Sequence, residues 1–261
     1  MCNGQTTTIQ AVLQGVAPWS VTWSDGTISN NILSSPATKT VLPVNPYPFP
    51  TNITYSVTAL SDAHCTAYSS NLTGSATILV NPRPTAALMS FAITNCDVGT
   101  TYTLTNALTG TAPWTVIWSS NGIPIATNNN VLSSPDTLTV SPTNATATNL
   151  LIATYTISAL TDNYCPAYTS NLTGSVSITV MPALSATDIN DGSYSIASSS
   201  SLIITNILTG TAPWILMWSD GTNLPASAST ATRKIYGTNV AVYGTNFTYY
   251  LTNITDASSS F

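Results

Sequence analysis

The segment Gly15-Val-Ala-Pro-Trp-Ser-Val-Thr-Trp-Ser-Asp-Gly26 decides the fold, because close copies of it occur twice more in the chain. The second copy runs from Gly110 to Gly122, and the third runs from Gly210 to Gly221. In every copy a second tryptophan follows the first by four positions. Recurrence of one segment at a period of roughly 100 residues indicates an array of homologous modules.

A second block repeats in the same order as the first. Tyr55–Asp62 reads Tyr-Ser-Val-Thr-Ala-Leu-Ser-Asp, and related sequences occupy Tyr155–Asp162 and Tyr249–Asp256. Two blocks that recur together three times predict three modules, each close to the ~100 residues of an immunoglobulin-like sandwich. We place them at residues 1–82, 83–182 and 183–261 and call them modules 1, 2 and 3.

Within a module the hydrophobic pattern has a period of two. Trp19, Val21 and Trp23 alternate with polar residues, and an Asp-Gly turn signal follows at Asp25-Gly26. Such runs, bounded by turn residues, are typical of half-buried strands. The chain has no glutamate and is rich in Thr and Ser, which disfavours helix. The predicted fold is therefore all-β, with three tandem immunoglobulin-like antiparallel β-sandwiches joined by proline-bearing linkers.

The composition excludes several classes of function. Charged residues make up 5% of the 261 residues, with four Lys or Arg, nine Asp and one histidine, His64. Four dispersed basic residues cannot neutralise a phosphate backbone, so we expect no nucleic-acid partner. No apolar run reaches the ~18 residues of a membrane span, so we expect no membrane insertion. A single histidine and no repeated catalytic set indicate no enzyme, no metal site and no cofactor.

The repeated motifs identify a resemblance. The runs G-x-A-P-W-x-V-x-W-S-D-G and T-Y-S-V-T-A-L-S-D-x-x-C resemble immunoglobulin-like, PKD-like repeat modules of large secreted surface proteins of Bacteroidota. The resemblance covers nearly the whole chain. It implies an extracellular or cell-surface protein of the kind used as adhesins, stalks and filament parts.

The four cysteines follow the repeats. Cys2 and Cys96 lie at matching distances before the first Trp of modules 1 and 2, and Cys65 and Cys165 close the second block. Module 3 has neither, with Ser259 at the second position. Because both cysteines are present together or absent together, we predict the disulfides Cys2–Cys65 and Cys96–Cys165. Four buried free thiols are the alternative. Disulfides would indicate an oxidising, extracellular location.

The outer modules are incomplete relative to module 2. Module 1 begins at Cys2 without the segment that precedes Cys96, and module 3 stops at Phe261 without a counterpart of the last strand, Gly174–Val180. Either the chain is a piece of a longer array, or another chain supplies the missing strand. The second alternative predicts an assembly edge at Tyr249, Leu251 and Asn253, closed by a copy of the same protein.

The low charge leaves a surface of hydroxyl and amide groups. Without charge, sandwiches tend to associate edge to edge unless contacts or glycans cover them. We therefore expect attached glycans. The candidate sites are six Asn-x-Thr triplets and one Asp-Thr-Leu triplet, which lie at Asn52, Asn71, Asn144, Asn171, Asn246, Asn253 and Thr137.

Two functions remain open from the sequence. The first is a structural subunit of an extracellular bacterial fibre or surface array, assembled head to tail. The second is an adhesin or carbohydrate-binding stalk that uses exposed aromatics such as Tyr47, Tyr68 and Tyr168. The tryptophan pairs could also stack on sugars, but core packing is the more usual role. The recurring Asp62 and its copies could bind calcium, but turn capping is more usual.

Overall fold

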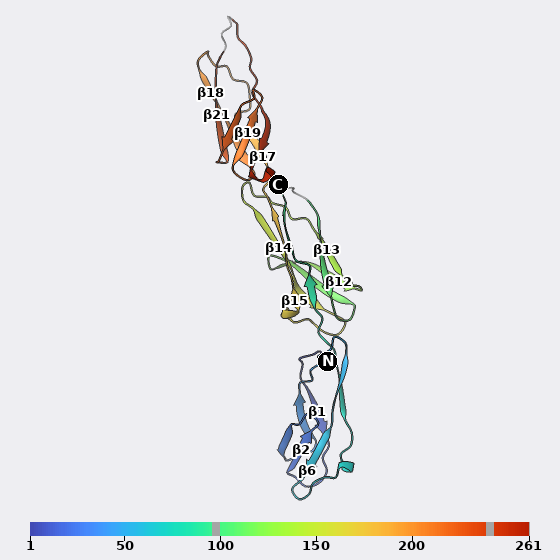
Figure 1. Cartoon of the computed structure of the whole chain (residues 1–261). Helices are drawn as coiled ribbons and strands as arrows, with labels where there is room; N and C mark the ends of the chain where they lie inside the picture. The colour runs from blue at the N-terminus through green and yellow to red at the C-terminus, as the bar shows by residue number, and fades with distance from the viewer. Residues whose placement is uncertain (96–99, 239–242, 261) are drawn as a thin grey trace.

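A computed structural model describes residues 1–95, 100–238 and 243–260, in which the regular structure consists of strands and three short 3₁₀ turns. The modules lie end to end in a row, with module 1 in blue, module 2 in green and yellow, and module 3 in orange and red (Figure 1). All strand pairings among the described residues join strands of the same module. The N-terminus lies at the junction of modules 1 and 2, and the C-terminus lies where module 3 meets module 2 (Figure 1).

Module 2 is the most complete sandwich. One sheet has the order β13-β10-β8-β15 and the other has the order β12-β11-β14-β16-β9. Most neighbours are antiparallel, while β15 with β8 and β16 with β9 are parallel. The strands of this module are β8 (Ala86–Leu88), β9 (Phe91–Asn95), β10 (Tyr102–Leu108), β11 (Trp114–Ser120), β12 (Ile123–Val131), β13 (Asp136–Val140), β14 (Leu151–Thr161), β15 (Leu172–Thr173) and β16 (Val176–Val180), with a 3₁₀ turn η2 at Thr169–Asn171.

Module 1 has shorter sheets, with the orders β1-β4, β3-β2-β6 and β5-β7. Among the strands of the described residues, β7 pairs only with β5, and only residues 1–3 run beside its other edge. Ile78 on β7 is therefore half-buried, whereas Ile178 on β16 is fully buried. The elements are β1 (Thr7–Ala11), β2 (Trp19–Trp23), β3 (Ile28–Ile32), β4 (Ala37–Val41), β5 (Thr51–Tyr55), β6 (Val57–Ser61), η1 (Ser69–Asn71) and β7 (Ala76–Val80).

Module 3 has two three-stranded sheets, β17-β18-β21 and β20-β19-β22. The second sheet ends at β22 in the described residues, and no strand equivalent to β16 follows. The prediction of an all-β fold of tandem immunoglobulin-like sandwiches is confirmed. The elements are β17 (Ser185–Asp188), β18 (Ser201–Thr209), β19 (Trp214–Trp218), β20 (Asn223–Ala226), β21 (Thr230–Tyr236), β22 (Leu251–Thr255) and η3 (Ala257–Ser260).

Each module has its own core, built from the inward positions of alternating strands. The core of module 2 joins Leu104 and Val140 of one sheet to Trp118, Ile157 and Ile178 of the other. Equivalent clusters occupy modules 1 and 3. Because Val, Ile, Thr and Trp suit a pleated, half-buried surface, the period of two places the same residue types inward in all three modules.

Gly74 of module 1 and Gly174 of module 2 occupy equivalent positions, but only Gly174 lies against β8. Gly74 and Gly174 share a left-handed φ of 83°, but a Cβ on Gly174 would lie 2.0 Å from the Leu88 carbonyl oxygen, whereas one on Gly74 meets nothing within 4 Å. We expect Gly74→Ala to cost only the ~1–2 kcal/mol of left-handed strain. Gly174→Ala should cost distinctly more, because β8 must move. Urea unfolding of the two variants measures this, and equal losses would contradict it.

Candidate functional site: the junction of modules 1 and 2

The first three residues place a cysteine at the end of module 1 that faces module 2. The Met1 amino group donates to the Leu79 carbonyl at 3.0 Å, and the Asn81 amide donates to the Met1 carbonyl at 2.8 Å. The Asn3 amide in turn donates to the Asn81 carbonyl at 2.8 Å. Residues 1–3 therefore run beside the end of β7, and Cys2 lies in a parallel bridge with Asn81.

A disulfide joins the two modules at this point. Cys2 bonds to Cys165, with their Cα atoms 5.6 Å apart and a sequence separation of 163. Both residues are buried. Cys165 follows β14 at the end of module 2 that faces module 1, so the bond forms a covalent lock across the junction.

The predicted pairings Cys2–Cys65 and Cys96–Cys165 are wrong. Cys2 lies beside Asn81, near the start of β5, whereas Cys65 follows the end of β6. The ten steps from Thr51 to Ser61 span roughly 33 Å at ~3.3 Å per residue. A disulfide requires Cα atoms within about 7 Å. Cys65 is an exposed free thiol, Cys165 is bonded to Cys2, and Cys96 lies outside the described residues.

Arg83 clamps the same junction from the linker. Its Nε donates to the Asn3 carbonyl of module 1 at 2.8 Å, and its Nη1 donates to the Pro166 carbonyl of module 2 at 2.7 Å. The guanidinium carbon lies 4.0 Å from the ring centroid of Tyr168, a cation–π contact. Arg83 was not among the predicted site residues. Its signal was a basic residue between two prolines, Pro82 and Pro84, in a chain with very few charges.

The recurring aspartates cap turns at the ends of the modules. Asp162 accepts hydrogen bonds from the backbone amides of Thr111, Tyr164 and Cys165 at 2.7 to 2.9 Å. Asp62 accepts the equivalent three bonds in module 1, and these lower the pKa of its carboxyl to about 2. The described residues hold no cluster of three or more His, Cys, Asp or Glu that could bind a metal. The three backbone amides that donate to each carboxylate make these aspartates turn caps.

The six tryptophans of the repeats all lie in the cores. Their exposed fractions run from 0 to 8%. Trp118 donates its indole Nε1–H to Asp136 Oδ2 at 3.0 Å, and Trp23 donates to Ser29 Oγ. These side chains form no sugar-stacking platform, and the core alternative is the correct one.

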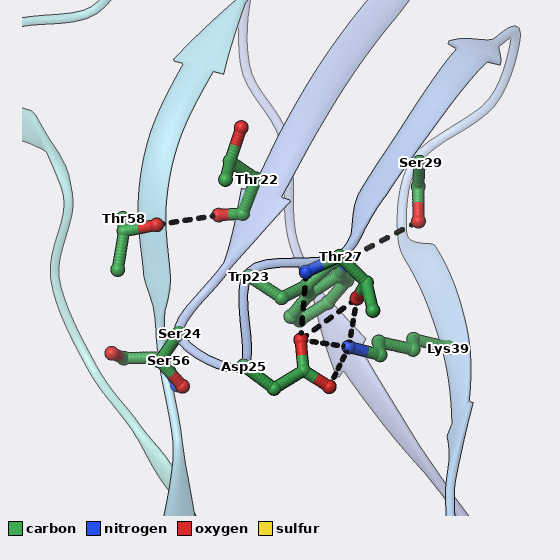
Figure 2. Close-up of polar contacts among 9 residues, drawn as sticks. All are labelled: Thr22, Trp23, Ser24, Asp25, Thr27, Ser29, Lys39, Ser56 and Thr58. Atoms are coloured by element: carbon green, nitrogen blue, oxygen red, sulfur yellow. Dashed lines mark hydrogen bonds and ion pairs between the residues drawn. The ribbon is translucent and has the colours of Figure 1, made fainter.

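Lys39 and Arg233 occupy the same position in modules 1 and 3 and make the two ion pairs of the described residues. Lys39 pairs with Asp25 in the turn after β2, where Thr27 also bonds the carboxylate (Figure 2). Arg233 pairs with Asp220 in the same way. The Lys39 ammonium, aided by the Thr27 hydroxyl, lowers the pKa of Asp25 to about 2.

The Asp25–Lys39 pair predicts a small dependence of stability on pH. Because the folded pKa lies below the unfolded value of about 3.9, the carboxylate stabilises module 1 above pH ~4, and this contribution is lost as pH falls towards 2. The pair is at the surface, so we expect a few tenths to about 1 kcal/mol. A double-mutant cycle of Asp25→Asn and Lys39→Gln at pH 7 and pH 2.5 measures it, and coupling that persists unchanged at the lower pH would contradict it.

The predicted glycosylation residues differ in their exposure to solvent. Asn52, Asn71, Asn246, Asn253 and Thr137 are exposed. Asn171 is partly buried and donates its amide to the Pro84 carbonyl at 3.2 Å.

The prediction of a glycan at Asn144 is wrong. Its amide is buried and donates to the carbonyls of Asn149 and Val180 at 2.7 and 2.9 Å. Asn45 makes the equivalent bonds in module 1, to Phe49 and Val80. These asparagines hold the long loop against the last strand of each module, so a glycan would have to break a buried contact.

The predicted assembly edge lies at the side of module 3. Leu251 and Asn253 belong to β22, which pairs with β19 and is the last strand of its sheet among the described residues. Tyr249 precedes β22 in the stretch 244–250, which forms no strand. The equivalent part of module 2, Leu151–Tyr155, pairs with β16.

Comparison with solved structures gives multi-domain immunoglobulin proteins. A structure of three immunoglobulin domains of titin aligns with a TM-score of 0.46 and 18% identity, covering 93% of this chain and 86% of that one. Sidekick-1 immunoglobulin domains 1–5 align with a TM-score of 0.27 and 14% identity, covering all of this chain and 54% of that one. No protein-family model and no curated protein sequence matches the chain.

Likenesses this weak carry no argument about function, and the class of fold rests on the chain's own strand pairing. That pairing defines a tandem immunoglobulin-like β-sandwich protein. None of the helical turns in the described ranges has the length and apolar character of a membrane-spanning helix.

Proposed function

We propose that this protein is a non-enzymatic structural subunit of an extracellular bacterial fibre or surface array. The observation that carries the proposal is the junction of modules 1 and 2, which a disulfide and the Arg83 clamp hold in one arrangement. A covalent lock of this kind resists bending of the row, which suits a stalk or fibre. Its disulfide is also compatible with an oxidising, extracellular location.

Head-to-tail assembly would complete module 3. In module 2, β16 covers the first half of β14, and its inward residues Val176, Ile178 and Val180 are fully buried. Among the described residues of module 3 no strand pairs with the stretch before β22, and Phe247 and Tyr250 in that stretch are more than half exposed. A strand from a neighbouring copy, with apolar residues at alternate positions, would bury this edge by β-strand addition. A contact of this kind that does not close into a ring generates a filament.

Glycans are the second part of the proposal. The exposed Asn52, Asn71, Asn246 and Asn253 and the exposed Thr137 are its sites. The surface between them carries few charges, so covalently attached sugars would limit lateral association of the filaments. Intact-mass measurement of the native protein should exceed the mass of the bare polypeptide. A match to the bare polypeptide would reject this part alone.

Negative-stain microscopy with a competing peptide tests the assembly. Purified protein should form filaments, and an excess of the peptide Gly174-Ser-Val-Ser-Ile-Thr-Val180 should shorten them, because this segment fills the equivalent slot in module 2. A scrambled peptide of the same composition is the control. Filaments that ignore the peptide would reject strand addition, and dispersed rods under all conditions would reject the fibre.

Exposed aromatics favour an adhesin or carbohydrate-binding stalk as the second candidate. Tyr47 stacks on Phe49 with the ring centroids 5.3 Å apart, and both rings are more than half exposed. Tyr68 is 81% exposed. Tyr168 is not among these candidates, because the Arg83 guanidinium lies over one face of its ring. Dispersed rods that bind a glycan array, and lose that binding in Tyr47→Ala, would favour this candidate.

A further inference from the structure

We infer that the free end of module 1, at Cys65, is a docking face for the cysteine-bearing end of another module of the same type, to which Cys65 becomes disulfide-bonded. The inference rests on the proposed function, because it names the contact made at one end of the row. Its partner is defined chemically: an immunoglobulin-like module with a cysteine at the position of Cys2 and an arginine at the position of Arg83. The junction of modules 1 and 2 shows the same contact already formed.

The Cys65 loop has the same hydrogen bonds as the bonded Cys165 loop. The Cys65 amide donates to Asp62 Oδ1 at 2.7 Å, and the Asp62 amide donates to the Cys65 carbonyl at 2.9 Å. Cys165 and Asp162 make both bonds at the same two distances. The next turn is also shared, since Ala67 donates to the Leu60 carbonyl at 2.8 Å, as Ala167 does to that of Leu160. The two thiols are therefore presented alike, one bonded and one free.

The groups around the cysteine are also repeated. In module 2 the receiving face consists of Cys165, the Pro166 carbonyl and the Tyr168 ring, which meet Cys2 and Arg83. In module 1 the same positions hold Cys65, Thr66 and Tyr68. Tyr68 is 81% exposed against 45% for Tyr168, and Cys65 is exposed whereas Cys165 is buried. Tyr68 and Cys65 are more exposed because no module covers this face in the structure, whereas module 1 covers the equivalent face of module 2.

Among the cysteines that the structure describes, none is left as a partner for Cys65 within the chain, because Cys2 is bonded to Cys165. Cys96 lies outside the described residues. The partner is therefore a further module, either joined upstream or carried by another chain. Bond formation joins the two Sγ atoms: each thiol loses a proton, and the two electrons reduce a small-molecule disulfide such as oxidised glutathione to two thiols.

A tandem chain tests the inference with the protein's own parts. Residues 1–95 of an upstream copy are followed directly by residues 2–261 of a full copy. The upstream segment thereby places β8 and β9 ahead of module 1 of the full copy. Cys2 of the upstream copy then faces the Cys65 loop of that module. Cys65 of the upstream copy is changed to serine, leaving one Cys65. After oxidation with glutathione disulfide, peptide mapping should find two bridges: upstream Cys2 to Cys65, and Cys2 of the full copy to Cys165.

The second bridge is the internal control for folding. If it forms while Cys65 reacts fully as a free thiol, the inference is overturned. Changing the remaining Cys65 to serine should remove one bridge and keep the other. Where the tandem chain does not fold, the native protein, alkylated on isolation from its source, decides: bridged Cys65 supports the inference, and alkylated Cys65 overturns it. Filaments in which Cys65 is alkylated would overturn this inference and leave the proposed function unchanged. A bridged Cys65 in protein that forms no filaments would support the inference and reject only the fibre.

Discussion

Trp118→Ala should destabilise module 2 by about 3–5 kcal/mol, the range for removing a large aromatic from a core. Trp118 is fully buried between the two sheets and contacts neighbours on both. Its loss also leaves Asp136, itself buried, without the indole donor at 3.0 Å. Asn128 still donates to the other carboxylate oxygen at 2.8 Å, so one oxygen of a buried carboxylate loses its partner, which adds to the cavity cost.

Urea unfolding followed by far-UV circular dichroism measures this effect. The matched control is Ile123→Ala in the same module, because Ile123 is 68% exposed on β12. We expect the control to stay within about 0.5 kcal/mol of the parent, as surface substitutions usually do. Losses of similar size in the two variants would contradict the assigned core.

Cys165→Ser should release the junction of modules 1 and 2. In the chain-entropy model a cross-link between residues 163 apart contributes up to about 5 kcal/mol. Because each module has its own core, we expect most of this effect in how the modules are held together rather than in their separate folds. The circular dichroism spectrum should stay the same, while small-angle scattering should show a broader distribution of lengths.

Cys65→Ser is the control for the junction variant, because Cys65 is an exposed thiol that is not part of the bond. It should leave both the scattering profile and the melting curve of the isolated chain unchanged. If Cys165→Ser scatters like the parent, the Arg83 clamp alone fixes the junction. If Cys65→Ser instead loosens the chain, the assigned pairing is wrong.

The period of two and the repeated blocks were enough to predict the three sandwiches, because inward and outward residues alternate in every strand. Trp19 and Asp62 could be assigned to core and turn from residue type and position alone. The cysteine pairing could not be deduced in this way. The repeats show that Cys2 is equivalent to Cys96 and Cys65 to Cys165, but not at which end of a module each lies.

Only the strand register shows at which end of module 1 each cysteine lies. Cys2 runs beside Asn81, whereas the Cys65 loop follows β6 at the far end. Arg83 was hidden for a related reason, since its partners Asn3 and Pro166 are far away in sequence. Asn144 matched a glycosylation triplet, and its burial depends on the loop closing over Val180. Each of these contacts is long-range, and local sequence carries little information about it.

Non-reducing peptide mapping of the oxidised 261-residue chain is the decisive test of the disulfide between modules 1 and 2. We expect one cross-linked pair that contains Cys2 and Cys165, with Cys65 recovered as an alkylated thiol. A cross-linked pair that contains Cys2 and Cys65 would contradict this pairing, because it would close module 1 on itself and remove the covalent lock between modules.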